Sequence, residues 1–256
     1  MRNHEASPTV DGMQASETQI PPAKGSAAWA RVFAAVYDAS LWNGERRGAR
    51  ATRVALLGQA RGRTVEIGAG TGLNVAHYPE GLDDLALTEP DPAMRSRLAT
   101  KVRRSGVPAR VVDAPAERLP FEDGSVDTVV STYVLCTVDA PHLALEEIIR
   151  VLRPDGQLLF VEHVRSGTAL LAWWQDLLAR PWRRFARGCR CNRATAELIA
   201  ACGLEFENLR ESSWRGMPPI VRPLIIGRAR PRVAACEASA AGTRRTGSLS
   251  PVGSER

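Results

Sequence analysis

The chain has 256 residues, of which 44% are hydrophobic, and a formal net charge of +6. This size favours one globular domain with appended segments. Six Arg and two Glu in residues 228–256 contribute +4 and residues 1–26 contribute −1, so the rest of the chain carries only +3. Because no basic stripe with interleaved aromatic residues appears, nucleic-acid binding is disfavoured.

Cysteine content and hydropathy bear on the compartment. The five cysteines lack the paired C-x-x-C spacing of a zinc site, and a chain of this size does not need disulfide staples; they are Cys136, Cys189, Cys191, Cys202 and Cys236. The N-terminus has no apolar signal region, and no apolar run approaches the roughly 20 residues that span a bilayer. We therefore expect reduced thiols, no metal and a cytoplasmic location.

In chain order, residues 1–26 are rich in Ser, Pro, Thr, Ala and Gln, and residues 231–256 form a basic segment poor in large apolar groups. Both ends are expected to be disordered. Residues 27–62 predict two N-terminal helices, over 27–42 and 45–60, the second ending near Gly62. The main domain is expected over residues 63–230.

Within this domain, short apolar runs alternate with helical segments. Strands are predicted at 63–67, 85–89, 109–112, 127–132, 157–163, 204–210 and 223–229. This alternation predicts an α/β fold with a doubly wound, Rossmann-like, mostly parallel sheet of seven strands and helices on both faces. A helix over 140–156 is expected to stop at Pro154. Residues 165–192 are expected to form a helical insert.

The stretch TVEIGAGTGLNV places Gly68, Gly70 and Gly72 directly after the first strand. Glycines there let a backbone approach a ligand closely, although a strand-to-helix turn can also use them for packing alone. Because Leu73 occupies the place of the third glycine of the dinucleotide fingerprint, a ligand without a pyrophosphate fits better. Glu89, about 20 residues further on, is placed to accept hydrogen bonds from ribose hydroxyls. Glu66 is placed either to bind a ligand ammonium group or to orient the loop.

Together with EPDPAM, APAERLPFEDGSVDTVV, EEIIRVLRPDGQLLFVEH and RPLIIGRA, these residues resemble the class I S-adenosylmethionine-dependent methyltransferases over residues 30–230. The resemblance makes residues 63–230 the methyltransferase domain. It implies S-adenosylmethionine as cofactor and assigns Glu89 to its ribose. It also places Glu66 and the glycine loop at the methionine end of the cofactor, and Ala116 and Glu117 beside its adenine. The full set of residues that the resemblance places beside the cofactor is Glu66, Gly68, Ala69, Gly70, Gly72, Glu89, Ala116, Glu117 and Ser131. The chain departs from the family pattern at Pro115, where an Asp is common, so a carboxylate at the adenine would have to come from Glu117 or Asp113.

A closer resemblance runs from Thr64 to Ala229. STYVLCTV, FVEHV, WWQDLLARPWRRFARGCRCNR and VRPLIIGRA look like the methyltransferase-like 7 group, which S-methylates small alkyl thiols, and its bacterial phospholipid or type 11 relatives. The implied function is methyl transfer to a small lipophilic thiol, hydroxyl or amine. Phospholipid N-methylation and C-methylation of a quinone precursor are the alternatives within this class, and a non-catalytic cofactor-binding module is the alternative outside it. The oligomeric state stays open.

Methyl transfer from a sulfonium is an in-line displacement, so the protein must hold the acceptor lone pair about 3 Å from the methyl carbon. A thiol, with a pKa near 8.5, needs little help, whereas a hydroxyl needs a positioned base. His163 and Tyr133 are the catalytic candidates, with packing as their alternative, and Cys136 is expected to pack.

The helical insert carries one apolar stripe formed by Leu170, Trp173, Trp174, Leu177 and Leu178. Such a stripe is typical of a core-facing helix. Its place after the fifth strand favours a lid over the acceptor. Trp173, Trp174 and Trp182 among arginines also suit peripheral membrane contact. Cys189 and Cys191 lack a third and a fourth ligand, so no metal is expected there.

Overall fold

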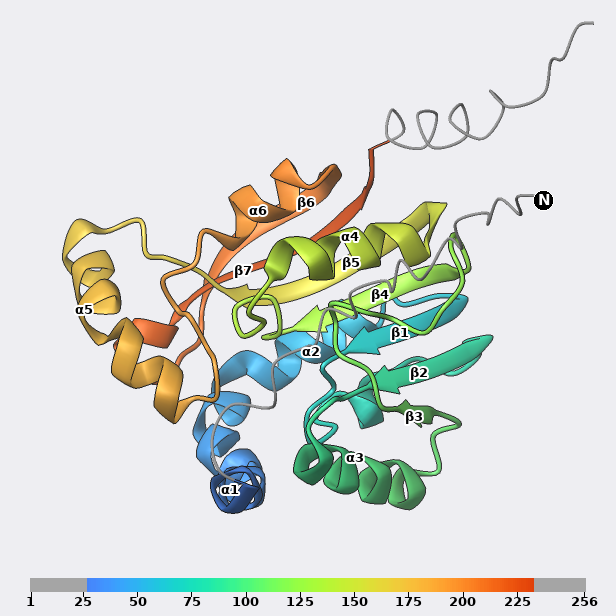
Figure 1. Cartoon of the computed structure of the whole chain (residues 1–256), viewed down its shortest axis with the longest axis horizontal. Helices are drawn as coiled ribbons and strands as arrows, with labels where there is room; N and C mark the ends of the chain where they lie inside the picture. The colour runs from blue at the N-terminus through green and yellow to red at the C-terminus, as the bar shows by residue number, and fades with distance from the viewer. Residues whose placement is uncertain (1–26, 233–256) are drawn as a thin grey trace, which may run out of the picture.

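The structure, a computed structural model, describes residues 27–232 (Figure 1). The predictions made for residues 1–26 and 233–256 lie outside this range. Seven strands form one sheet in the order β3-β2-β1-β4-β5-β7-β6. Their bounds are β1 Arg63–Ile67, β2 Asp84–Thr88, β3 Arg110–Val112, β4 Val126–Thr132, β5 Leu152–His163, β6 Leu204–Ser213 and β7 Pro223–Pro231. Within the described residues β7 alone runs opposite to the other six strands, so the predicted mostly parallel sheet is confirmed.

Helices cover both faces of the sheet, as the doubly wound pattern requires (Figure 1). They are α1 Ala27–Gly44, α2 Arg50–Leu57, α3 Pro92–Ser105, α4 Pro141–Val151, α5 Ala169–Phe185 and α6 Thr195–Ala201. On one face α4 and α6 bury Leu145, Ile148 and Ile199 against the sheet. On the other, α2 buries Leu56 and Leu57, and none of the described helices is long and apolar enough to cross a bilayer.

The order of the strands reverses at one point of the sheet. Successive parallel strands run outward from β1 in one direction and from β4 in the other, so the order reverses between these two strands. Ligands of open α/β sheets bind in the crevice at such a point, beyond the carboxyl ends of the strands. Both α1 and α5 lie at this end of the sheet (Figure 1).

Two helix ends differ from the sequence prediction. The helix expected to stop at Pro154 ends at Val151, because a residue before proline disfavours helical dihedrals and Leu152 instead begins β5 opposite Val126. The second N-terminal helix ends at Leu57 and is separated from α1 by a π-helical turn over Glu45–Ala49. That turn is kinked at Gly48, whose φ of 130° lies outside the helical range.

Candidate active site

The glycine loop leaves β1 at the reversal point with Gly68, Gly70 and Gly72 all at positive φ. A Cβ on Gly68 would lie 2.8 Å from a methyl group of Val134, and one on Gly72 would lie 2.8 Å from a methyl group of Leu98. A Cβ on Gly70 would meet nothing closer than the Gly68 carbonyl oxygen at 4.0 Å. The outer glycines therefore serve packing, whereas Gly70 leaves open space beside the backbone that a side chain would fill.

Glu89 follows β2 and faces this loop. Its Oε2 accepts a hydrogen bond from the Gly70 backbone N–H and its Oε1 accepts one from the Asp91 N–H, both at 2.8 Å. Burial, only partly offset by these bonds, raises the pKa of the carboxyl from 4.5 to about 7. Asp91 in turn caps α3 by accepting from the Ala93 and Met94 N–H groups, so the carboxylate and the loop are held by one connected network.

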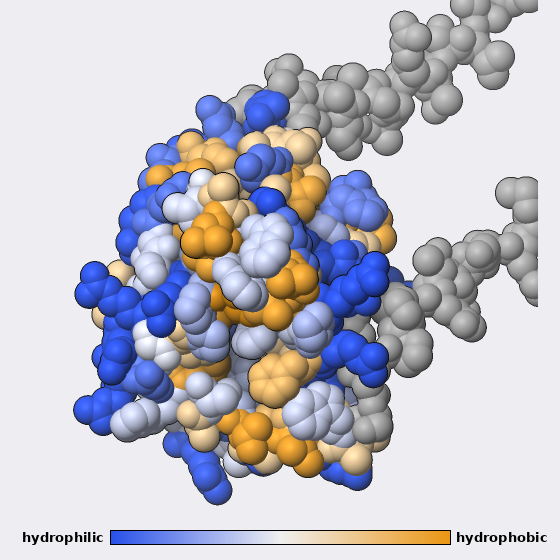
Figure 2. Space-filling model, turned by 90° about the vertical axis from the view of Figure 1, so that its left-hand side faces the viewer, coloured by the Kyte–Doolittle hydropathy of each residue, from blue (hydrophilic) through white to orange (hydrophobic). Residues whose placement is uncertain are grey.

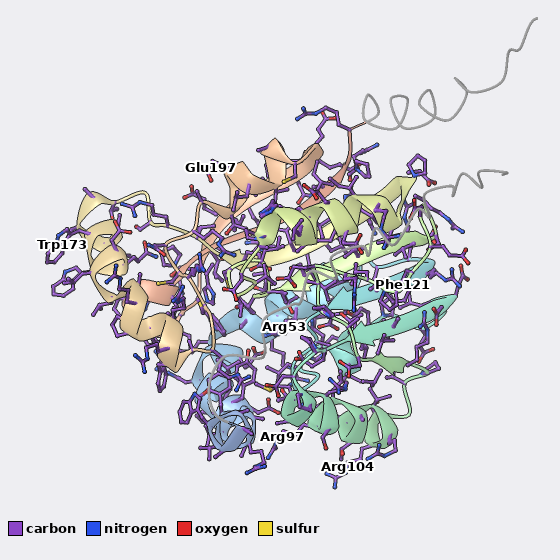
Figure 3. All side chains as sticks on the ribbon, in the orientation of Figure 1. Arg53, Arg97, Arg104, Phe121, Trp173 and Glu197 are labelled. Carbon is purple, nitrogen blue, oxygen red and sulfur yellow. The ribbon has the colours of Figure 1, made fainter. Side chains whose placement is uncertain are left out.

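Glu66, in β1, lies beneath the loop and is fully buried. Asn74 Nδ2 and the Tyr78 hydroxyl each donate to one of its two oxygens at 2.7 Å, and Arg53 (Figure 3) donates to the Asn74 amide oxygen at 2.8 Å. Burial raises the pKa of the Glu66 carboxyl. Of the two roles considered from sequence, these contacts support the orientation of the loop.

The segment expected beside the adenine follows β3. Ala116 is buried and Glu117 is half-buried. Asp113 is exposed and pairs with Arg95 of α3 at 2.7 Å. Asp113 is thus engaged in an ion pair, and the role of Glu117 at the adenine, where Pro115 offers no carboxylate, stays a prediction.

Glu162, near the end of β5, was not anticipated from sequence. Its buried carboxylate accepts from the Ser131 hydroxyl at 2.7 Å and from three consecutive backbone N–H groups, those of Val134, Leu135 and Cys136, at 3.0–3.1 Å. These bonds bend the chain sharply after β4 and hold Tyr133 at a φ of 61°, which is strained for a non-glycine residue. The sequence signal that could have identified Glu162 is an acidic residue between Val161 and His163, within a strand that is otherwise buried.

Three rings, those of Tyr133, His163 and Trp214, pack against one another beyond the ends of β4 and β5. The Tyr133 ring lies 4.4 Å from Trp214 and 5.0 Å from His163, measured between centroids. His163 Nδ1 lies 3.3 Å from the Cys136 sulfur. Burial raises the pKa of the Tyr133 hydroxyl, so this group stays protonated near neutral pH. The structure thus brings both candidate catalytic residues together, with Trp214 as a further wall that the sequence did not indicate.

The helical insert packs differently from its sequence pattern. Most of the stripe faces solvent, with Trp173 55% exposed and pointing away from the body (Figure 3), and Figure 2 shows apolar residues gathered on this side of the molecule. The inward contacts come from Leu178 and from Leu171 and Trp182, which pack on the cysteine-rich cluster beneath. Of the stripe, only Leu178 fits the core-facing alternative. The lid over the acceptor, which the sequence favoured, stays a prediction.

Gln175 fixes the position of α5. Its buried amide nitrogen donates to the carbonyl oxygens of Val164, Cys191 and Ile220, and its amide oxygen accepts from the Ser166 N–H. A buried polar side chain with all its partners satisfied specifies one arrangement of the elements that it joins. The insert is thereby locked onto the ends of β5 and β7.

A cleft of about 960 Å³ lies between α1 and α3 and reaches Thr71 and Asp91, beside the glycine loop. Asp38 of α1 accepts from the Thr71 hydroxyl at 2.5 Å and from Lys101 Nζ at 3.0 Å, so α1 is tied across the loop. Arg187, after α5, pairs with Asp91. The cleft lies at the upper end of the range of small-molecule pockets, about 300–1,000 Å³.

Comparison with known proteins adds the family. Residues 65–160 match the model of a methyltransferase domain. The human thiol S-methyltransferases TMT1B and TMT1A are 35% and 32% identical to the chain, each over 64% of it, and the aligned parts cover 66% and 68% of those proteins. The chain thus spans about two thirds of the length of these relatives. A phosphatidylethanolamine N-methyltransferase of Cereibacter sphaeroides is 31% identical over 57% of the chain and 72% of its own length.

Solved structures share the fold. A methyltransferase of Thermotoga maritima, described as S-adenosylmethionine-dependent and as a possible histamine N-methyltransferase, superposes with a TM-score of 0.59. It is 21% identical and covers 78% of this chain and 96% of its own. At this identity the likeness concerns the architecture alone.

Proposed function

Because the chain belongs to the S-adenosylmethionine-dependent methyltransferases, we propose that it transfers the cofactor's methyl group to a small lipophilic acceptor, and that this acceptor is a thiol. The open space at Gly70, directly beside the Glu89 carboxylate, is the observation that carries the first part. It offers a backbone surface for the ligand and an acceptor for ribose hydroxyls within one hydrogen-bonded unit.

The residues around the loop fit the cofactor. Gly68, Ala69, Gly70 and Gly72 would line its methionine end, and Glu89 would accept from its ribose hydroxyls. When bound, the cofactor supplies an electrophilic methyl group on a sulfonium. The chain contributes position and water exclusion, since α1 and Arg187 close over the loop through Asp38 and Asp91.

The state of His163 favours a thiol acceptor. Its Nδ1 is engaged by Cys136, and its ring is stacked on Trp214 and packs at a tilt against Tyr133. Tyr133 stays protonated near neutral pH. His163 Nδ1 and the Tyr133 hydroxyl are therefore not free bases, and His163 Nε2, although unpartnered within residues 27–232, is buried away from solvent. A hydroxyl acceptor needs an accessible base and a thiol does not. The name of the two human relatives supports the same acceptor.

Calorimetry with S-adenosylmethionine and S-adenosylhomocysteine tests the cofactor. Labelled cofactor offered with a short alkyl thiol, a catechol, phosphatidylethanolamine and a demethylated quinone tests the acceptor. We expect label in the thiol. Label in phosphatidylethanolamine or in the quinone would overturn the thiol assignment in favour of N- or C-methylation. Cofactor binding without transfer to any of them would favour a non-catalytic module.

We also propose that the exposed face of α5 contacts an anionic membrane surface while the protein itself is cytoplasmic. Leu170 and Leu177 are exposed with Trp173 and Trp174 on this face (Figure 2). Arginines at 180, 183 and 184 are exposed along the same helix and complement acidic headgroups. Trp182, which the sequence grouped with them, packs inward and is not part of this surface.

Sedimentation with lipid vesicles tests this contact. We expect binding to vesicles that contain phosphatidylserine and little binding to pure phosphatidylcholine. A variant with Trp173→Ser and Trp174→Ser should stay in the supernatant. The control is Leu143→Ser, which removes an exposed apolar side chain of α4. Equal binding by both variants would contradict the proposal.

A further inference from the structure

Three side chains with metal-ligand chemistry meet behind Tyr133. Cys136 follows β4, His163 ends β5 and Cys189 follows α5. All three are buried, and one ligand atom from each lies within 4.8 Å of the other two. The sequence pairs Cys189 with Cys191 and offers no further ligand, whereas the fold pairs Cys189 with two residues that lie 53 and 26 positions earlier in the chain.

The spacing is that of zinc ligands. His163 Nδ1 lies 3.3 Å from the Cys136 sulfur and 3.7 Å from the Cys189 sulfur. In a tetrahedral site with Zn–N of about 2.0 Å and Zn–S of about 2.3 Å, the edge between nitrogen and sulfur is about 3.5 Å. The two observed distances lie on either side of that value.

Contacts inside the cluster use only one nitrogen of the imidazole. Cys136 is hydrogen-bonded to Cys189 and lies 3.3 Å from His163 Nδ1, so the two S–H groups can pair these three atoms in a chain. The other ring nitrogen, Nε2, is buried and has no hydrogen-bond partner within residues 27–232. What marks this cluster is therefore the close approach of three buried atoms with metal-ligand chemistry.

The backbone at each ligand is held in place. The Cys136 N–H donates to Glu162 at 3.1 Å, and the Cys136 carbonyl accepts from the Arg190 N–H at 2.8 Å. The latter bond ties the segment of Cys189 directly to that of Cys136. The His163 carbonyl accepts from the Thr195 hydroxyl at 3.2 Å. These bonds fix the backbone that carries the three ligand side chains.

We propose that Cys136, His163 and Cys189 bind one zinc ion and that the acceptor thiol takes its fourth coordination position. The second half rests on the proposed function, namely a thiol acceptor. Thiolate and imidazole ligands favour zinc among the common divalent ions. Three protein ligands with an open fourth position are typical of catalytic zinc, whereas structural zinc has four.

The charge balance suits a buried site. Two thiolates, a neutral imidazole and Zn²⁺ carry no net charge, so burial costs little. An acceptor thiolate adds one negative charge. Arg193 compensates it, since this buried guanidinium donates to the carbonyl oxygens of Leu135 and Val138, on either side of Cys136 in the chain.

The site would prepare the acceptor for transfer. On binding zinc, the acceptor thiol releases its proton to solvent, because coordination lowers the pKa of a thiol. A sulfur lone pair then forms the new S–CH₃ bond while the methyl–sulfonium bond breaks, and the bonding electrons stay on the sulfur of S-adenosylhomocysteine. The product is a neutral thioether, which is a weaker ligand than the thiolate and leaves.

Metal content tests the site without reference to activity. The full chain, purified without a histidine tag and under reducing conditions, should contain about one zinc ion per molecule by mass spectrometry. Cys136→Ser, Cys189→Ser and His163→Ala should each lose most of it. Cys202→Ser should keep it, because Cys202 lies at the end of α6, outside the cluster. Circular dichroism identifies any variant that fails to fold, and retention of zinc by all three folded ligand variants would overturn the proposal.

Cobalt separates this inference from the proposed function. Co²⁺ added to the metal-free protein should produce thiolate-to-cobalt charge-transfer absorption, and a short alkyl thiol should change that spectrum. Absence of both zinc and cobalt binding, with S-adenosylhomocysteine still bound, would sink the zinc site and leave the methyltransferase standing. A Cys136–Cys189 disulfide, found by mass spectrometry in the absence of reductant and metal-insensitive, would instead make the cluster a redox pair and overturn the zinc assignment. Zinc binding without binding of S-adenosylhomocysteine would support the metal site and overturn the proposed function alone.

Discussion

If Glu89 binds the ribose as proposed, cofactor binding should depend on pH in the physiological range. An acid with a pKa of about 7 is about nine-tenths ionised at pH 8 and about one-tenth ionised at pH 6. The Gly70 and Asp91 N–H groups already point at the two carboxylate oxygens, so only the ionised form has lone pairs left for two ribose hydroxyls. The cofactor should therefore select the ionised form.

The magnitude follows from these populations. If the bound carboxyl stays ionised throughout, the Kd for S-adenosylhomocysteine should rise about tenfold from pH 8 to pH 6, which corresponds to about 1.4 kcal/mol. A carboxyl with the ordinary pKa of 4.5 would change the Kd by only about 3% over the same interval.

The same shift affects stability with a definite sign. Because the native carboxyl has its pKa raised from 4.5 to about 7, the native state binds more protons than the unfolded state between these values. Stability should then fall as pH rises through this window, by about 3 kcal/mol from this group. The contribution is fully present below pH 4.5 and is lost above pH 7.

Isothermal titration calorimetry at pH 6, 7 and 8 measures the binding effect, with Glu89→Gln as the control for every other titrating group. The variant should bind weakly and without this pH dependence. A wild-type Kd that is flat from pH 8 to pH 6, or a pH dependence that survives in Glu89→Gln, would refute the assignment of the effect to this carboxylate.

Three further predictions concern the loop and its support. Gly70→Ala should weaken S-adenosylhomocysteine binding by more than about tenfold. The control is Gly124→Ala, which has nearly the same φ and equally open space and should bind normally. Both variants should lose about 1 kcal/mol of stability in urea denaturation, and equal binding by both would contradict the role of Gly70 in binding the cofactor. Glu66→Gln should fold and bind the cofactor as the wild type does, because its amide oxygen can accept from Asn74 and its amide nitrogen can donate to the Tyr78 hydroxyl oxygen. Glu66→Ala should cost about 3 kcal/mol in the same assay. Cofactor binding lost in Glu66→Gln would assign the carboxylate to the ligand. Glu162→Ala should cost about 3–5 kcal/mol of unfolding free energy because it leaves buried donors unpaired, and a wild-type denaturation midpoint would show that its hydrogen bonds contribute nothing.

The sequence predicted the strands and the glycine loop because both depend on local features of the chain. Apolar runs of four to seven residues and the glycine spacing act within a few residues, so the seven strands and the loop at Gly70 followed directly from the chain. The position of Glu89 after the second strand followed from the same alternation. Element ends were less accurate, as at Pro154, because the pairing of Leu152 with β4 competed with the helix.

Tertiary structure decided which side chains face solvent and which lie against one another. The stripe around Trp173 has a helical period, but only packing through Gln175 turned it toward solvent. Likewise, Glu162 meets backbone N–H groups that precede it by 26 to 28 residues, and His163 meets Cys136 and Cys189 from opposite directions along the chain. No local pattern encodes such contacts, because they depend on which strands become neighbours in the sheet. The sequence therefore determined the fold and the glycine loop, while the fold alone brought Tyr133, Cys136, His163 and Cys189 together.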